Sequence, residues 1–184
     1  MGVTALLLID IQNDYFPDGN MELVGMDDAA RQARRVLDRF RARGLPVFHI
    51  QHIANRAGAT FFLPDTPGAE IHASVAPHGG EPIIRKHFPN AFRETELDER
   101  LREREIEEVV VCGAMTHMCI DTTVRAAFDL GYRCRLVADA CATRDLRYGG
   151  AVVPARQVQA AFLAALSMPF AEIVDADGLE SHLR

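Results

Sequence analysis

The sequence predicts a three-layer α/β protein in which helices cover both faces of an open, parallel, six-stranded sheet. Short apolar runs recur along the chain, and helical stretches fill most of the gaps between them. Several of these runs are apolar on both faces, as buried parallel strands are. Alternation of this kind is typical of a parallel sheet covered by helices. We expect the Rossmann-like strand order 3-2-1-4-5-6.

Six apolar runs account for the expected strands. Each is short and is followed by a turn signal or by a stretch with helical spacing. In chain order they cover residues 4–9, 46–52, 82–85, 108–112, 133–138 and 171–174.

Four helices are expected between these strands. The first begins after an N-cap at Asp27 or Asp28 and runs to about Arg43, where Gly44 supplies the left-handed residue that ends many helices. Residues 95–105 predict a shorter, charged helix. The helices over residues 116–130 and 154–167 are more apolar, so we expect them to pack on the sheet.

The segment from His52 to Gly80 has no sustained periodicity and is rich in Gly, Pro, Ala and Thr. Loops of this length are usually functional or disordered. The aromatic pair Phe61 and Phe62, followed by Leu63, argues against complete disorder. We therefore expect an ordered loop that covers or lines a pocket.

Length, composition and charge exclude several classes of protein. The 184 residues predict a single domain over residues 1–184, and 48% of them are hydrophobic, enough for a sizeable core. The net charge of −6 and the scattered Lys and Arg disfavour a nucleic-acid partner. No apolar run approaches the ~18–20 residues of a membrane span. The four cysteines form no CxxC pair. We expect a cytoplasmic protein with reduced thiols and no membrane partner.

Three polar residues follow strands at the edge where parallel sheets bind ligands. Asp10 follows the first strand, Lys86 follows the third, and Cys119 lies in the segment that joins the fourth strand to its helix. With the expected strand order, the first and fourth strands are neighbours at the point where the order reverses. Asp10 and Cys119 could therefore come within hydrogen-bonding distance.

Each of these residues also has a structural interpretation. Asp10 could cap the following turn, Lys86 could be a solvated charge, and Cys119 could be a small buried side chain. Thr116 as an N-cap would place Cys119 in the first helical turn, where the helix dipole favours a thiolate. The other cysteines are interpreted as structural; they are Cys112, Cys134 and Cys141.

Three segments of the sequence resemble the isochorismatase-like cysteine hydrolases. They are Leu-Leu-Ile-Asp-Ile-Gln-Asn-Asp-Tyr-Phe at residues 7–16, Arg85 and Lys86 followed by Ala91 and Phe92, and Gly-Ala-Met-Thr-His-Met-Cys at residues 113–119. They occur in the family's order and spacing, and the resemblance covers nearly the whole chain. Together they are far more specific than any one motif.

The resemblance implies a catalytic triad in which Cys119 is the nucleophile, Asp10 the general base and Lys86 an electrostatic partner. It also implies an oxyanion hole formed by the backbone amides of Met115 and Cys119, and a cis peptide between Ala114 and Met115. A thiolate attack on a carbonyl carbon, with Asp10 moving the proton, is chemically sound for such a set.

The sequence departs from one branch of this family. Nicotinamidases carry an Asp-x-His metal motif after the second strand, whereas this chain has His49 and His52 with no acid beside them. Nicotinamidase is therefore disfavoured, and we expect no metal and no cofactor. A site formed by His49 and His52 with His72, His78 or His87 stays an alternative, although these spacings match no familiar metal pattern.

The main functional hypothesis is a cysteine hydrolase that cleaves a C–N bond of a small amide or cyclic amide through a thioester. The alternatives are an isochorismatase-type vinyl ether hydrolase and an inactive binding module on the same fold. A small-molecule substrate is the expected partner, and we expect Phe16, Phe61, Phe62 and Phe92 to line its pocket. The family usually associates, and the long apolar loop would be easier to order against a second subunit, so we expect a homo-oligomer.

Overall fold

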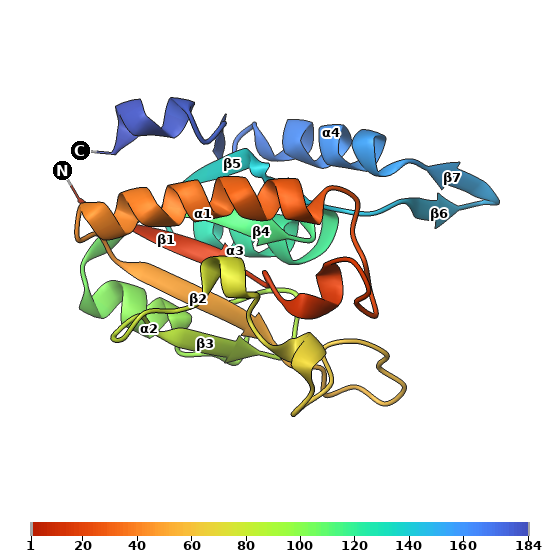
Figure 1. Ribbon diagram of the computed structural model, residues 1–184. Coiled ribbons are helices and arrows are strands. Elements are labelled where there is room, and N and C mark those ends of the chain that lie inside the picture. The colour runs from red at the N-terminus through yellow and green to blue at the C-terminus, as the bar shows by residue number, and fades with distance from the viewer. Residues whose placement is uncertain (1, 184) are drawn as a thin grey trace.

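A computed structural model describes residues 2–183, and its centre is one parallel sheet of six strands (Figure 1). The order β3-β2-β1-β4-β5-β8 confirms the expected one, because β8 is the sixth strand of this sheet along the chain. The strands are β1 (Val3–Ile9), β2 (Val47–His52), β3 (Ile83–Lys86), β4 (Ile106–Ala114), β5 (Arg133–Ala142) and β8 (Glu172–Val174).

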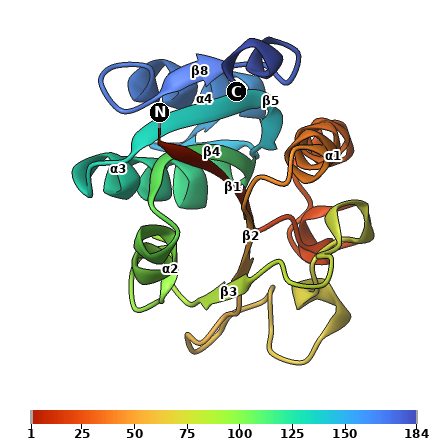
Figure 2. The same cartoon turned by 90° about the vertical axis from the view of Figure 1, so that its left-hand side faces the viewer.

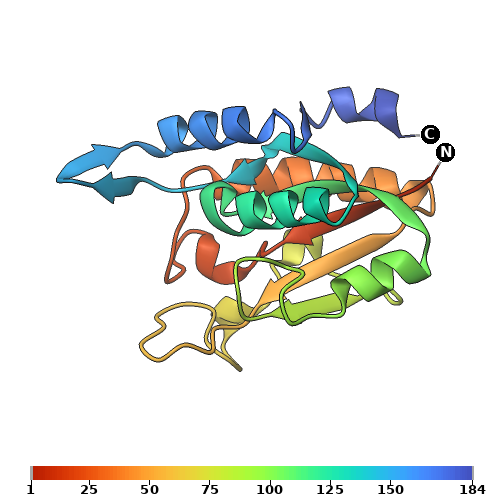
Figure 3. The ribbon, with the colours of Figure 1, turned by 180° about the vertical axis from the view of Figure 1, so that it is seen from behind.

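Helices cover both faces of the sheet, as Figure 2 shows from the side. Helix α1 (Met26–Ala42) lies on one face, where its apolar side meets alternate residues of β1 and β4 in one core cluster. Helices α2 (Leu97–Glu103) and α3 (Asp121–Asp129) lie on the other face with the second core cluster (Figure 3). Helix α4 (Ala155–Leu166) packs against α3.

Two helix starts differ from those expected. The N-cap of α1 is Gly25, with φ of 74°, so Asp27 and Asp28 lie in the first turn instead of capping it. There they still face the positive end of the helix dipole. The expected helix over residues 116–130 divides into a π-helical turn (Thr116–Ile120) and α3.

A hairpin that the sequence analysis did not predict projects from the body of the protein (Figure 3). It consists of β6 (Leu146–Tyr148) and β7 (Ala151–Val153), paired antiparallel. Gly149 and Gly150 make the turn with positive φ values of 56° and 80°. A two-residue Gly-Gly loop between short runs that contain Tyr and Val is a hairpin signal, and it would have identified this element.

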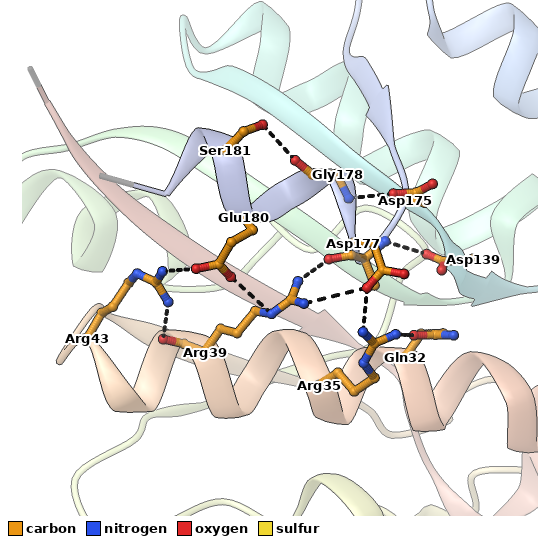
Figure 4. Close-up of polar contacts among 11 residues, drawn as sticks. Gln32, Arg35, Arg39, Arg43, Asp139, Asp175, Asp177, Gly178, Glu180 and Ser181 are labelled. Atoms are coloured by element: carbon orange, nitrogen blue, oxygen red, sulfur yellow. Dashed lines mark hydrogen bonds and ion pairs between the residues drawn. The ribbon is translucent and has the colours of Figure 1, made fainter.

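The C-terminal segment returns to α1 through exposed ion pairs, as Figure 4 shows. Arg35 and Arg39 pair with Asp177, and Arg39 and Arg43 pair with Glu180 in the 3-10 turn Gly178–His182. We call this contact the C-terminal seam. Within residues 2–183, no helix is long and apolar enough to cross a membrane.

Candidate active site

The ends of three strands bring Asp10, Lys86 and Cys119 to one edge of the sheet. Asp10 directly follows β1 with φ of 51°, a conformation that non-glycine residues adopt mainly where the surrounding structure enforces it. Lys86 is the last residue of β3, and Cys119 lies in the π-helical turn after β4. All three side chains are buried.

Gly113 allows β4 to approach β1 at this edge. A Cβ atom there would lie 2.0 Å from the carbonyl oxygen of Ile9, and the φ of Gly113 is 126°. A side chain at this position would push β4 away from β1. The glycine therefore lets the segment that carries Cys119 begin beside Asp10. In this segment the peptide bond between Ala114 and Met115 is cis.

The ammonium group of Lys86 lies at the centre of the site. Its Nζ donates to Oδ2 of Asp10 at 2.7 Å and lies 3.3 Å from Sγ of Cys119. It also lies 2.9 Å from Nδ1 of His52, at the end of β2. Burial alone would lower the pKa of Lys86, but Asp10 and Cys119 outweigh it and raise this pKa. Lys86 is therefore a buried cation with its three protons directed to three partners.

Cys119 is a thiol at neutral pH in this structure. Burial and the nearby carboxylate of Asp10 raise the pKa of Cys119 well above its ordinary value, and Lys86 only partly offsets them. The expected N-cap at Thr116 is wrong, because Thr116 begins a π-helical turn whose N-cap is Met115, so Cys119 does not lie in the first turn of an α-helix. The α-helix begins only at Asp121, and Cys119 is 3% exposed.

Asp10 has one oxygen engaged and one available. Oδ2 accepts from Lys86, whereas Oδ1 is buried and has no hydrogen-bond partner within the described residues. A carboxylate oxygen of Asp10 lies within 4.8 Å of Sγ of Cys119. The carboxylate of Asp10 is therefore near enough to the thiol to act as its proton acceptor.

His52 belongs to this site, although the sequence analysis considered it only as a metal ligand. Burial and the charge of Lys86 lower the pKa of His52 to about 4, so the ring is neutral at pH 7 and Nδ1 accepts from Lys86. Gln12 holds the backbone of His52: its Oε1 accepts from the amide of His52 at 2.8 Å, and its Nε2 donates to the carbonyl of His52 at 2.9 Å. A spacing pattern does not reveal such a role, because the contact depends on the register of β2 against β3, which pairs His52 with Lys86.

Asp10, His52 and Cys119 are side chains of kinds that bind metals, and their ligand atoms lie within 4.8 Å of one another. However, Nζ of Lys86 contacts all three residues. Because this ammonium stands where a metal ion would have to bind, the donor set does not fit a metal unless Lys86 moves away. Of the histidines in the alternative set, His49 bonds to Glu81 and His72 to Ser74, so their side chains have structural partners.

A cavity of about 370 Å³ opens beside Cys119. Its walls are mostly apolar, and most of them come from β2, the loop after it, and the segments that follow β1, β3, β4 and β5. The lining residues are Tyr15, Met21, His52, Ala54, Asn55, Arg56, Ala59, Phe61, His87, Phe88, Pro89, Met115, Met118, Cys119 and Arg144. The loop after β2 thus contributes to the site, as its length suggested.

Of the four phenylalanines expected in the pocket, the cavity wall contains Phe61 but not Phe16, Phe62 or Phe92. Phe62 is 1% exposed and packs on the ring of Tyr15. Phe16 stacks on His72, and Phe92 stacks on Tyr132 in the other core. The sequence marked these rings as apolar, but it does not show which neighbour each would meet.

The motif after β1 fixes the loop that covers the cavity. Oδ2 of Asp14 accepts from the amide of Phe62 at 2.6 Å, and Oδ1 accepts from both nitrogens of Asn20. Asn13 donates to the carbonyl of Pro67 at 2.7 Å. These bonds order the loop, so the acidic and amide residues that follow Asp10 have structural roles.

Comparison with known proteins finds relatives that match most of the chain. The family model "Isochorismatase domain" matches residues 4–177. The isochorismatase family protein YddQ of Bacillus subtilis is 52% identical, over 92% of this chain and 94% of its own. An isochorismatase-like hydrolase of Oleispira antarctica has a crystal structure that superposes with a TM-score of 0.94 at 50% identity, covering 98% of this chain and 97% of that one. The nicotinamidase of Escherichia coli is 31% identical, over 74% of this chain and 82% of its own.

The fold and the buried site therefore define an enzyme of the hydrolase class. The chain belongs to the isochorismatase family.

Proposed function

We propose that this protein is a cysteine hydrolase that cleaves the C–N bond of a small amide or cyclic amide through a thioester on Cys119. The observation that carries the proposal is the contact of Lys86 with both Asp10 and Cys119 at the edge of an apolar cavity. The relationship to a nicotinamidase supports an amide as the substrate class. The identity of the amide is set by the cavity walls.

The positions of these side chains support the following reaction. The carboxylate of Asp10 takes the proton of the Cys119 thiol as the sulfur forms a bond to the amide carbon. The tetrahedral intermediate then breaks its C–N bond, and the same proton passes to the leaving nitrogen. Water next attacks the thioester, giving one proton to Asp10, which returns it to the sulfur as the acid departs. Lys86 stays charged and stabilises the negative charge as it passes from Asp10 to the sulfur during proton transfer.

The raised pKa of Cys119 fits this order of events. The thiol is neutral when the substrate enters, so no buried thiolate has to be maintained in the resting enzyme. Deprotonation occurs together with the attack, when the carbonyl oxygen takes up the charge. We assign the backbone amides of Met115 and Cys119 as the donors to that oxygen, because they belong to the turn that carries the nucleophile.

A panel of small amides tests this function directly. The enzyme should release ammonia or an amine from at least one member, and a sample quenched in acid during turnover should show added acyl mass on the peptide that contains Cys119. Hydroxylamine should remove this mass, as it does for thioesters. If no amide is cleaved while a vinyl ether is cleaved without any adduct on Cys119, the vinyl ether hydrolase, whose chemistry needs an acid and no nucleophile, is favoured instead.

We also retain the prediction of a homo-oligomer. The projecting β6–β7 hairpin is one segment that offers an apolar contact, since Tyr148 is 88% exposed and Val152 is 44% exposed. Light scattering across a wide concentration range would decide the point. A mass that stays near the 20.4 kDa of one chain would end this prediction.

A further inference from the structure

Two arginines line the cavity that opens beside Cys119. Arg144 follows β5, and Arg56 lies in the loop after β2. They come from opposite sides of the sheet's centre, because β1 and β4 separate β2 from β5. The mechanism described above uses neither of them.

Arg144 lacks the partner that a partly buried guanidinium normally has. Its Nε is buried with no hydrogen-bond partner within residues 2–183, and its Nη1 contacts only the sulfur of Met21, at 3.3 Å. A thioether is a weak acceptor. Arg41, also of intermediate exposure, has one buried nitrogen without a partner as well, but it makes two bonds of 2.7 Å to the carboxylate of Glu81. Burial of a charged donor without an acceptor is unfavourable, so an anion that binds to Arg144 would remove this cost.

The rest of the cavity wall makes this positive charge effective. No Asp or Glu is among the residues that line the cavity, although the chain carries a net charge of −6. Asp10 lies behind Cys119, and Lys86 pairs with it at 2.7 Å. Apolar rings and thioethers fill much of the wall, from Phe61 and Phe88 to Met115 and Met118. In such surroundings water screens a charge poorly, and an anion is attracted more strongly.

We propose that the substrate is an amide that also carries a carboxylate, and that Arg144 binds this carboxylate while Cys119 attacks the amide carbon. The inference rests on the amide hydrolase function proposed above. A guanidinium presents parallel N–H donors that match the two oxygens of a carboxylate, which is why this anion is preferred over a neutral polar group. Arg56 adds a second positive charge from the loop that covers the cavity.

Pairs of small amides that differ only in this charge test the proposal. Malonamic, succinamic and glutaramic acids each carry one amide and one carboxylate, and malonamide, succinamide and glutaramide are their neutral partners. For at least one pair, kcat/KM should be about tenfold or more higher for the acid, since a charge-assisted bond contributes this much. The best chain length reports the distance between the sulfur and the guanidinium.

Two arginine variants make the test specific. Arg144→Gln should reduce the preference for the acid, measured as the ratio of kcat/KM for the acid to that for its neutral partner, to about twofold or less. Arg147→Gln is the matched control, because Arg147 is an exposed residue of the β6–β7 hairpin and does not line the cavity. Binding of succinate and glutarate to the Cys119→Ser protein, measured by calorimetry with and without Arg144→Gln, gives a readout that needs no turnover.

The outcomes separate this inference from the function on which it rests. Cys119-dependent hydrolysis of the acids and the diamides at equal rates, unchanged in Arg144→Gln, would overturn the carboxylate and leave the amide hydrolase standing. Binding of the dicarboxylates through Arg144 with no amide cleaved and no adduct on Cys119 would support the anion site and overturn the hydrolase. A preference for the acids that survives in Arg144→Gln would assign the anion to another residue and contradict the proposal.

Discussion

The protein uses ion pairs in two very different places. At the active-site edge, Lys86 and Asp10 form a pair of 2.7 Å in which both side chains are 0% exposed. At the C-terminal seam, shown in Figure 4, arginines of α1 meet Asp177 and Glu180, whose side chains are 76% and 51% exposed. The first region has a few fully buried charges, and the second has many charges in contact with water.

This difference in burial predicts different roles for the two sets of ion pairs. A buried pair loses the hydration of two ions and often contributes less to folding than apolar residues of the same size would. An exposed pair loses little hydration and gains little energy, because water and salt screen it. We therefore expect changes at Lys86 and Asp10 to affect catalysis and folding strongly, and changes at the seam to affect neither strongly.

The largest effect is expected from removal of the nucleophile. Cys119→Ala should lower kcat/KM for an amide substrate by about 10³-fold or more, because no other group in the site can form the acyl bond. The control is Cys134→Ala, whose sulfur is buried on β5 and contacts only the backbone carbonyls of Val124 and Tyr132. It should keep most of the activity. Full activity in Cys119→Ala would falsify the mechanism.

The buried pair can be broken one partner at a time. Lys86→Met should abolish activity and lower the free energy of unfolding by about 3–5 kcal/mol, because the charge of Asp10 is then left in the core without a partner. The double variant Lys86→Met with Asp10→Asn removes both charges. Its stability should recover much of the loss while its activity stays absent, as measured by urea denaturation and amide turnover on the same samples.

Recovery of stability without activity would show that the pair is retained for its chemistry. If the double variant stays as unstable as the single one, the pair also holds the fold, and the contrast with the seam is weaker than we state.

Whether the sequence predicts the position of a residue depends on whether its neighbours are determined by the periodicity of strands and helices or by the path of loops. The strands were predictable because β1 and β4 are buried on both faces, and the positions of Asp10 and Lys86 follow from where their strands end. The proximity of Cys119 follows from the strand order. The particular contacts do not follow from this order. His52 meets Lys86 through the register of β2 against β3, and Arg144 lines the cavity from the segment after β5.

The aromatic residues show the same limit. Phe61 and Phe62 are adjacent and equally apolar in sequence, yet one lines the cavity and the other is 1% exposed in the core. The bond from the amide of Phe62 to Asp14 fixes this choice, and it joins residues 48 positions apart. The start of α1 was misplaced for a smaller reason, because Gly25 caps the helix with its backbone and without a side chain.

Glu81 lies between the two extremes of burial and links stability to pH. Burial would raise its pKa, but hydrogen bonds from Arg41, the amide of His78 and His49 outweigh this and lower the pKa to about 2 from the ordinary 4.5. Because the pKa is lower in the folded state, the ionised form stabilises the fold above pH 4.5, and this stabilisation is lost as the pH falls towards 2.

Glu81→Gln should therefore lower the free energy of unfolding at pH 7 by on the order of 2 kcal/mol. The difference from the unchanged protein should shrink between pH 4.5 and about 2, measured by urea denaturation at each pH. Glu99→Gln is the control, since Glu99 is exposed and has no ion pair within the described residues. A difference that is constant over this range would show that Glu81 acts through packing and not through its charge.

The smallest effect is expected at the seam. Glu180 accepts from Arg39 and from Arg43, and Glu180→Gln removes the charge from both pairs with little change of shape. Because its side chain is 51% exposed, the free energy of unfolding should change by no more than about 1 kcal/mol, and high salt should reduce the change further. Amide turnover should be unaltered, since the seam lies outside the cavity wall. A loss above about 2 kcal/mol that persists in high salt would mean that these exposed pairs hold the C-terminal segment on α1. The contrast between a buried pair used for catalysis and exposed pairs of little energetic effect would then be wrong.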